Sequence, residues 1–210
     1  MIRLLILAPL LLTCPLAQAD EPGDFTHYVL ALSWNAAWCE AEGDARKAPQ
    51  CDSRHDHGWL MHGLWPQRER DWPEYCRSTA RDPSRAETGA MADIMGSGGL
   101  AWHQWKKHGR CAGLTARAYF RAARRAYEQV TRPEILRQIK EPLSIAPSVI
   151  EDAFLAANPT LDASQLSVKC RGGLLREVRI CFTKDLEPRS CTPQVSRECG
   201  SPTATFVPMR

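Results

Sequence analysis

Apolar residues recur at every second position in several stretches of the chain, which is the pattern of strands with a buried face. The pattern predicts a mostly buried strand over 28–34 and a second over 58–65. Between them, residues 40–56 are polar and predict a loop. Two further strands are predicted over 165–170 and 174–182, joined by a glycine turn.

Helical signals lie between the second and third of these strands. Residues 86–95 predict one helix, and Thr115 is a suitable N-cap for another. A further helix is expected after Pro133. The pair Ser148 and Glu151 has the spacing of a capping box and predicts a helix that ends near residue 158. The order strands, helices, strands indicates an α+β fold rather than regular βαβ units.

The first nineteen residues have the pattern of a secretory signal peptide. A charged residue, Arg3, precedes an apolar run over 4–12, and Ala17-Gln18-Ala19 is an A-x-A cleavage site. The run is shorter than the ~20 residues that a membrane span needs. Cys14 offers the alternative of a lipid anchor, although Thr13 fits an anchor site poorly. We therefore expect a secreted or periplasmic protein without a membrane anchor, cleaved near Ala19.

Eight cysteines remain after residue 19, and in an exported protein an even number predicts disulfides. The sequence alone allows about 105 pairings. A Cys39–Cys51 bridge could close the polar loop. No two cysteines have C-x-x-C spacing, which argues against a zinc knuckle and a thioredoxin-like site. Residues 20–210 are expected to form a single domain, a length that suits one core.

The charge balance gives little information about partners. The whole chain carries a formal net charge of +3. Loss of Arg3 leaves 26 basic and 24 acidic residues, or +2. That is weak evidence for a polyanionic partner. The arginines at 117, 121, 124 and 125 would form one basic helix face, which is either solvated or an RNA contact surface.

Two segments concentrate candidate acid–base residues: 61–66 contains His62, and 102–111 contains His103 and His108. If the second segment is helical, His103 and Lys107 are four residues apart, as are Gln104 and His108, so all four lie on one side. Two histidines can act as base and acid in one turnover near neutral pH. A lysine beside them would stabilise negative charge on a phosphate. Without a carboxylate cluster, this set suits a phosphodiester better than Mg²⁺.

Several other residues have plainer interpretations. A lone histidine such as His27 is typical of a surface or satisfied core position. Cys51, His55 and His57 have zinc-like spacing, but oxidation of Cys51 would remove a ligand. The tryptophans can pack in the core or stack on bases, and core packing is expected for most of them.

The two segments resemble the paired signatures of the ribonuclease T2 (Rh/S-type) family of secreted endoribonucleases. The matching residues are His62-Gly63-Leu64-Trp65-Pro66 and His103-x-Trp105-x-Lys107-His108-Gly109-x-Cys111. The resemblance implies an α+β fold with a mainly antiparallel central sheet flanked by helices and reinforced by disulfides, and no metal or other cofactor. It also implies four disulfides: Cys76–Cys111, Cys170–Cys199, Cys181–Cys191 and, by remainder, Cys39–Cys51.

The same resemblance implies a role for each residue of the two segments. His108 would be the base that takes the 2′-hydroxyl proton, and His62 the acid that protonates the leaving 5′-oxygen. His103 would hold the phosphate, Lys107 would stabilise the transition state, and Trp65 would lie beside the scissile phosphate. Positions that bind the bases are too variable to assign.

Gln104 departs from the family pattern, which has Glu at this position. An amide keeps hydrogen-bonding ability but cannot carry negative charge or share a proton. We therefore expect a working but slower enzyme with a shifted pH profile, and Gln104→Glu tests this.

The expected substrate is single-stranded RNA, cut to 2′,3′-cyclic phosphate ends. DNA lacks the 2′-hydroxyl and should survive. A monomer is expected. One rival is a secreted RNA-binding protein in which Gln104 has silenced catalysis, and a more distant rival is a metal-dependent hydrolase.

Overall fold

The computed structural model describes residues 20–197 and 199–210. The expected signal peptide and Cys14 lie outside the described residues. Within the described part of the chain, no helix is both long and apolar enough to cross a membrane.

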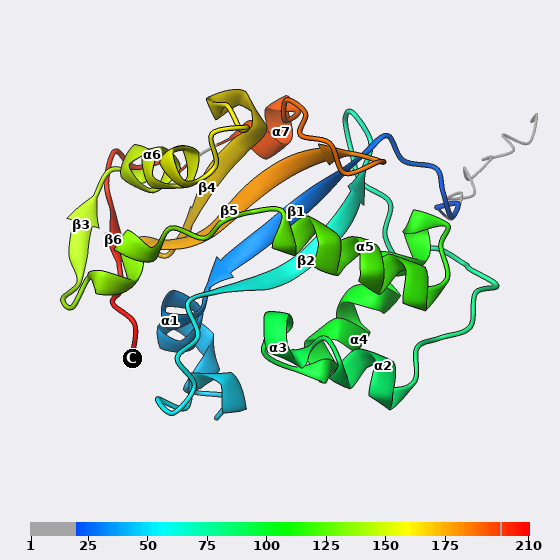
Figure 1. Cartoon of the computed structure of the whole chain (residues 1–210), viewed down its shortest axis with the longest axis horizontal. Helices are drawn as coiled ribbons and strands as arrows, with labels where there is room; N and C mark the ends of the chain where they lie inside the picture. Colours follow the sequence, from blue (N-terminus) through cyan, green and yellow to red (C-terminus); the bar gives the residue numbers. More distant parts are fainter. Residues whose placement is uncertain (1–19, 198) are drawn as a thin grey trace, which may run out of the picture.

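A six-stranded, mostly antiparallel sheet forms the centre of the molecule (Figure 1). Its path runs β2-β1-β5-β6-β3, and β4 also pairs with β5. Only β5 and β6 pair in parallel among the described strands. The bounds are β1 His27–Trp34, β2 Trp59–Gln67, β3 Leu143–Ile145, β4 Leu166–Arg171, β5 Leu174–Thr183 and β6 Ala204–Phe206. The α+β fold with a mainly antiparallel sheet is therefore confirmed.

Helix α5 packs on the core face of this sheet, against β1 and β2, and other helices lie on either side of it. In Figure 1, α2, α3 and α4 lie on the β2 side, and α6 and α7 lie beside β4. Their bounds are α1 Asn35–Trp38, α2 Arg85–Gly89, α3 Ala92–Met95, α4 Gly98–Lys107, α5 Ala116–Glu128, α6 Pro147–Ala157 and α7 Pro193–Ser196. Single tighter helical turns cover Pro49–Cys51, Gly109–Ala112, Glu134–Gln138 and Ala163–Gln165, and a π-helical turn covers Cys39–Gly43.

The alternation along β1 separates a core face from a second face of the sheet. Leu30, Leu32 and Trp34 are fully buried in the main core, against the apolar side of α5. Each such side chain contributes about 1.5–3 kcal/mol by leaving water. Val29, Ala31 and Ser33 point to the opposite face. The small side chains on this second face leave room for larger groups from β2 and β5.

Several local predictions need correction. The capping box at Ser148 is wrong, because α6 begins at Pro147 with Ala146 as its N-cap. Proline has no N–H to satisfy, so it suits the first helical position, and the N-cap is Ala146 rather than Ser148. The predicted loop 40–56 contains two helical turns. The single helix predicted over 86–95 is two short ones, with a break at Ala90-Met91. Thr115 caps α5 as predicted, with its hydroxyl oxygen accepting from the Ala118 N–H.

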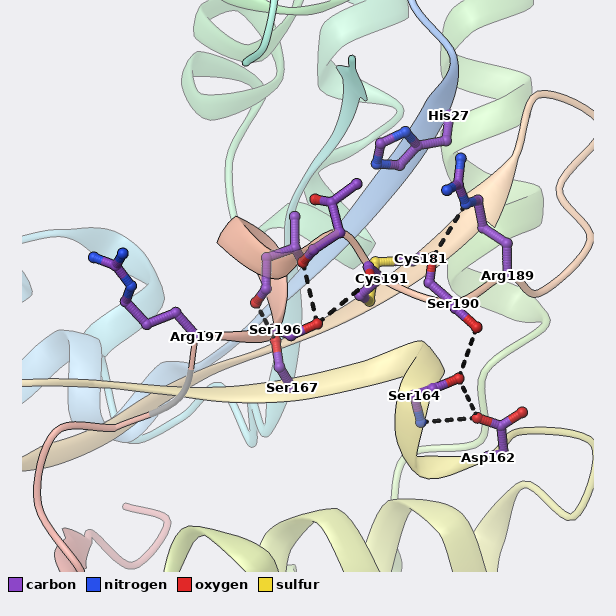
Figure 2. Close-up of a disulfide and its surroundings, with 12 residues drawn as sticks. His27, Asp162, Ser164, Ser167, Cys181, Arg189, Ser190, Cys191, Ser196 and Arg197 are labelled. Atoms are coloured by element: carbon purple, nitrogen blue, oxygen red, sulfur yellow. Dashed lines mark hydrogen bonds between the residues drawn. A yellow bond between two sulfur atoms is a disulfide. The ribbon is translucent and has the colours of Figure 1, made fainter. Parts of the chain in front are cut away.

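Four disulfides reinforce the fold, and they are the four pairings that the family resemblance implies: Cys39–Cys51, Cys76–Cys111, Cys170–Cys199 and Cys181–Cys191. Figure 2 shows Cys181 of β5 bonded to Cys191, with Ser190 held by the Ser164 hydroxyl at 2.8 Å. Cys181 packs with Val29 and Val195 on the second face of the sheet. The bridge therefore fastens the segment after β5 over that face.

Candidate active site

A β-bulge at His62 interrupts the pairing of β1 with β2. Ala31 lies opposite Gly63, whereas the next residue, Leu32, lies opposite Met61, so His62 has no partner in the ladder. A bulge of this kind bends the strand and re-aims the extra side chain, and it is common beside active sites. The sequence pattern predicted the strand but not the bulge.

The second face of three neighbouring strands brings the site residues together. Trp65 of β2 pairs with Val29, and Arg179 of β5 pairs with Ala31. Because Ala31 is small, Arg179 can extend towards β2, and its guanidinium lies 5.1 Å from the centre of the Trp65 ring. Glu177 is one pleat further along β5, opposite Ser33.

Helix α4 supplies the other predicted residues, as the four-residue spacing indicated. Ser97 caps its start, and His103, Gln104 and Lys107 lie within it. His108 is the C-cap, and its N–H still donates to the Gln104 carbonyl at 2.9 Å. Gly109 follows directly after this cap, at the position where glycine commonly ends a helix.

Trp65 connects β2 to this helix. Its indole N–H donates to Gln104 Oε1 at 2.7 Å, and Gln104 is only 2% exposed. The Trp65 ring centre lies 5.1 Å from that of His62 and 5.4 Å from that of His108. The structure therefore brings both predicted acid–base histidines to one aromatic ring, from two elements that are distant in sequence.

Burial and neighbouring positive charge lower the pKa values of both helix histidines. Burial lowers the pKa of His108 to about 3, with help from Lys107, His62 and His103. Its Nδ1 is buried without a hydrogen-bond partner among the described residues, which adds to the cost of a charged ring. Burial, followed by Lys107, also lowers the pKa of His103. Such surroundings favour an anion over another cation.

Lys107 extends from the end of α4 to an ion pair. Its Nζ lies 3.2 Å from Glu74 Oε2, and both side chains are partly exposed, at 33% and 40%. The loop that carries Glu74 is held against α4 by Cys76–Cys111 and by a bond from the Tyr75 N–H to the Lys107 carbonyl. The pair is therefore available for exchange with another anion.

Glu177 is a site residue that the sequence reasoning missed. Its Oε2 accepts from His62 Nδ1 at 2.9 Å, and its Oε1 accepts from Arg179 Nε at 2.7 Å. Burial raises the pKa of this carboxyl, but the contacts with His62 and Arg179 outweigh it and leave the pKa below its ordinary value. Arg176 and Arg179 flank it in β5, so the pattern of the strand does not single out this glutamate.

An open cavity of about 580 Å³ adjoins His62, Glu177 and Arg179. Both apolar and basic side chains line it. The apolar ones include Trp38, Leu60, Met95 and Leu100, and the basic ones are Arg46, Lys169, Arg171, Arg176 and Arg179. Its mixed lining and size suit a small polar aromatic ligand.

The alternative of a zinc site at Cys51, His55 and His57 is not supported by the structure. Cys51 is bonded to Cys39, so it has no free thiolate. The His55 and His57 rings stack on each other with centres 5.3 Å apart. Among the described residues, no group of three histidine, cysteine or acidic side chains is placed to hold a metal ion.

Most of the other residues with plainer interpretations behave as expected. Trp34, Trp59 and Trp105 are buried in the core, while Trp72 is half exposed. Arg124 of the basic helix face is paired with Asp93. His27, by contrast, is fully buried, and its Nε2 lacks a hydrogen-bond partner in the described part of the chain.

Comparisons with known proteins point to one family. Residues 25–191 match the model of the Ribonuclease T2 family. A ribonuclease of Aeromonas hydrophila is 29% identical over 202 residues, which cover 87% of this chain and 85% of the relative. Ribonuclease I of Escherichia coli is 26% identical, covering 90% of this chain and 88% of the relative.

Solved structures show the same fold. An RNase-related protein from Calystegia sepium superposes with a TM-score of 0.69 at 20% identity, covering 88% of this chain and 98% of that one. Ribonuclease MC1 from bitter gourd seeds gives 0.64 at 20% identity, covering 87% and 100%. Since the matched family region spans most of the chain, this protein belongs to the ribonuclease T2 family and is by class a T2-type RNA endonuclease.

Proposed function

We propose that this chain is an exported, monomeric endoribonuclease whose single catalytic domain, residues 20–210, cleaves single-stranded RNA through the substrate's own 2′-hydroxyl. The products are a 2′,3′-cyclic phosphate and a free 5′-hydroxyl. The reaction needs no metal or other cofactor. DNA lacks the nucleophile and is not cut. Export delivers the enzyme to the periplasm or beyond the cell.

The contrasting surroundings of two histidines carry this proposal. His108 is buried among positive charges and has a lowered pKa, so it is neutral and can accept a proton. His62 is bonded to an ionised carboxylate through Nδ1, which leaves Nε2 for the substrate. This contrast supports His108 as the base and His62 as the acid.

Each proton and bond then has a place in one in-line displacement. His108 takes the 2′-hydroxyl proton, and the oxygen attacks phosphorus. The bond from phosphorus to the 5′-oxygen breaks, and His62 gives its proton to that oxygen. His103 holds the phosphate, and Lys107 exchanges Glu74 for the phosphoryl oxygens as their negative charge grows. Trp65 lies beside the phosphate.

The cavity beside His62 suits the departing nucleoside. An acid must lie within hydrogen-bond reach of the oxygen that it protonates, so the downstream nucleoside has to lie on the His62 side. A base can pack against the apolar residues of the lining, among which Trp38 offers a stacking surface. The arginines of the lining can meet the next phosphate of the strand.

The test is digestion of a defined RNA oligonucleotide with EDTA present, followed by analysis of the new ends. We expect cyclic phosphate ends from the wild type, none from His62→Ala or His108→Ala, and no cleavage of the matching DNA. Binding without cleavage would instead support the silenced RNA-binding protein, and loss of activity in EDTA the metal-dependent hydrolase.

A further inference from the structure

Glu177 is a buried carboxylate whose burial needs a physical reason. Its side chain is 10% exposed in the middle of β5. Removing a carboxylate from water is unfavourable unless it is well paired. Both oxygens are paired here, one with His62 and one with Arg179. The carboxylate therefore links a residue of the bulge in β2 to a strand two positions across the sheet.

Arg179 completes a closed set of contacts around His62. Its guanidinium bonds Glu177 and lies over the Trp65 ring, and the Trp65 ring meets the His62 ring nearly at right angles, at 81°. The imidazole is thus held at Nδ1 by a carboxylate and on one side by an aromatic ring. Neither contact occupies Nε2.

We propose that Glu177 is a positioning residue for His62, and that Arg179 moderates its effect by sharing the carboxylate. Through Nδ1, Glu177 fixes the ring so that Nε2 faces the leaving 5′-oxygen, and its charge helps His62 to keep a proton until the bond breaks. Arg179 takes part of that charge, so that the proton can still be given up. This role rests on the proposed function of His62 as the acid.

Other charges that face His62 come from several elements. Within α4 and at its end are Lys107, which carries a positive charge, and His103 and His108, whose pKa values are lowered. The cavity next to His62 is also lined by charged residues of the π-helical turn, of the segment after that turn, of β4 and of β5: Glu42, Arg46, Lys169, Arg171 and Arg176. Glu177 is the carboxylate that bonds the ring directly, so its removal should dominate.

The test compares pH profiles of kcat/KM for a dinucleotide. Glu177→Gln keeps the shape and removes the charge, so the alkaline limb should move to lower pH, with a loss of about 10- to 100-fold at pH 8. That loss is part of the roughly 10²–10⁴-fold that a general acid contributes. Arg179→Met should move the same limb to higher pH, the opposite direction. Glu177→Asp keeps the charge and should leave the limb near its wild-type position.

Glu187→Gln is the matched control, because this exposed glutamate on the turn after β5 lies outside the site and should change nothing. Glu177→Gln in a His62→Ala background should cost no further activity, since the two act as one unit. If the alkaline limb does not move in Glu177→Gln or Arg179→Met, while His62→Ala is inactive, then the role of Glu177 is overturned and the acid assignment of His62 stands. An active His62→Ala overturns the acid assignment and this inference with it. Thermal unfolding of each variant shows whether the fold is retained.

Discussion

Gly63→Ala tests whether the Trp65–Gln104 bond holds the two halves of the site together. A Cβ at residue 63 would lie closer than 3.0 Å to both Gln104 Oε1 and Trp65 Nε1, the two atoms of that bond. Ordinary contacts of carbon are ~3.5 Å, so the pair must withdraw by at least about 0.5 Å. The hydrogen bond is then lost or stretched, although no histidine is altered.

The expected loss follows from that displacement. A misplacement of up to about 1 Å costs on the order of 10²-fold in rate. A buried donor and acceptor left unpaired cost about 1–3 kcal/mol of unfolding free energy. Steady-state cleavage of a dinucleotide and urea unfolding measure the two effects.

Gly89→Ala provides the control. This glycine ends α2 in the open, with no atom within 4 Å of an added Cβ. Its activity should equal that of the wild type, and its stability should be unchanged or slightly higher. A Gly63→Ala enzyme with wild-type kcat/KM would refute the idea that this bond positions the site.

Three further predictions concern charge. Because its pKa is lowered, His108, the proposed base, should stay neutral in acid, and the acidic limb of kcat/KM should lie well below pH 6.5. Gln104→Glu should move this limb to higher pH, because it adds negative charge near His108. An acidic limb at pH 6.5 in the wild type would contradict this. Glu74→Gln should free Lys107 and lower the inhibition constant of inorganic phosphate by up to about 5-fold, the modest effect expected for an exposed ion pair. An unchanged inhibition constant would count against a role of Lys107 in binding phosphate. Burial lowers the pKa of His27 to about 4, so below pH 6.5 the unfolded chain binds more protons than the folded protein. The free energy of unfolding should therefore fall as the pH is lowered from about 6.5 to 4. Urea titrations should show a weaker pH dependence for His27→Gln, and an equal pH dependence in both proteins would show that His27 does not titrate this way.

The sequence predicted the parts of the site that depend on local periodicity. The alternation over 28–34 and 58–65 located β1 and β2, and the spacing of His103, Gln104 and Lys107 on one side of a helix matches α4. These patterns repeat within a few residues, so they can be recognised without knowing which elements meet. The disulfide pairing, in contrast, came from family resemblance, because cysteine spacing alone leaves it open.

The parts that were missed depend on contacts between distant residues. Glu177 and His62 are 115 positions apart, and only the pairing of β1 with both β2 and β5 brings them together. The bulge at His62 adds one residue to one strand, so Met61 lies opposite Leu32 of the core face and Gly63 opposite Ala31 of the second face. Apolar residues stand on both sides of His62, so the sequence pattern does not show this change of face. The same reasoning explains the wrong capping box, since Pro147 rather than Ser148 sets where α6 begins.

The division of labour between the two histidines is the central claim, and a change of leaving group tests it most directly. A nucleoside 3′-(4-nitrophenyl phosphate) releases a weakly basic phenolate that needs no proton, whereas a dinucleotide releases a 5′-oxygen that does. His62→Ala should lose roughly 10²–10⁴-fold on the dinucleotide but less than about 10-fold on the aryl ester. His108→Ala should lose its activity on both. Equal losses for His62→Ala on the two substrates, or recovery of His108→Ala on the aryl ester, would contradict the account.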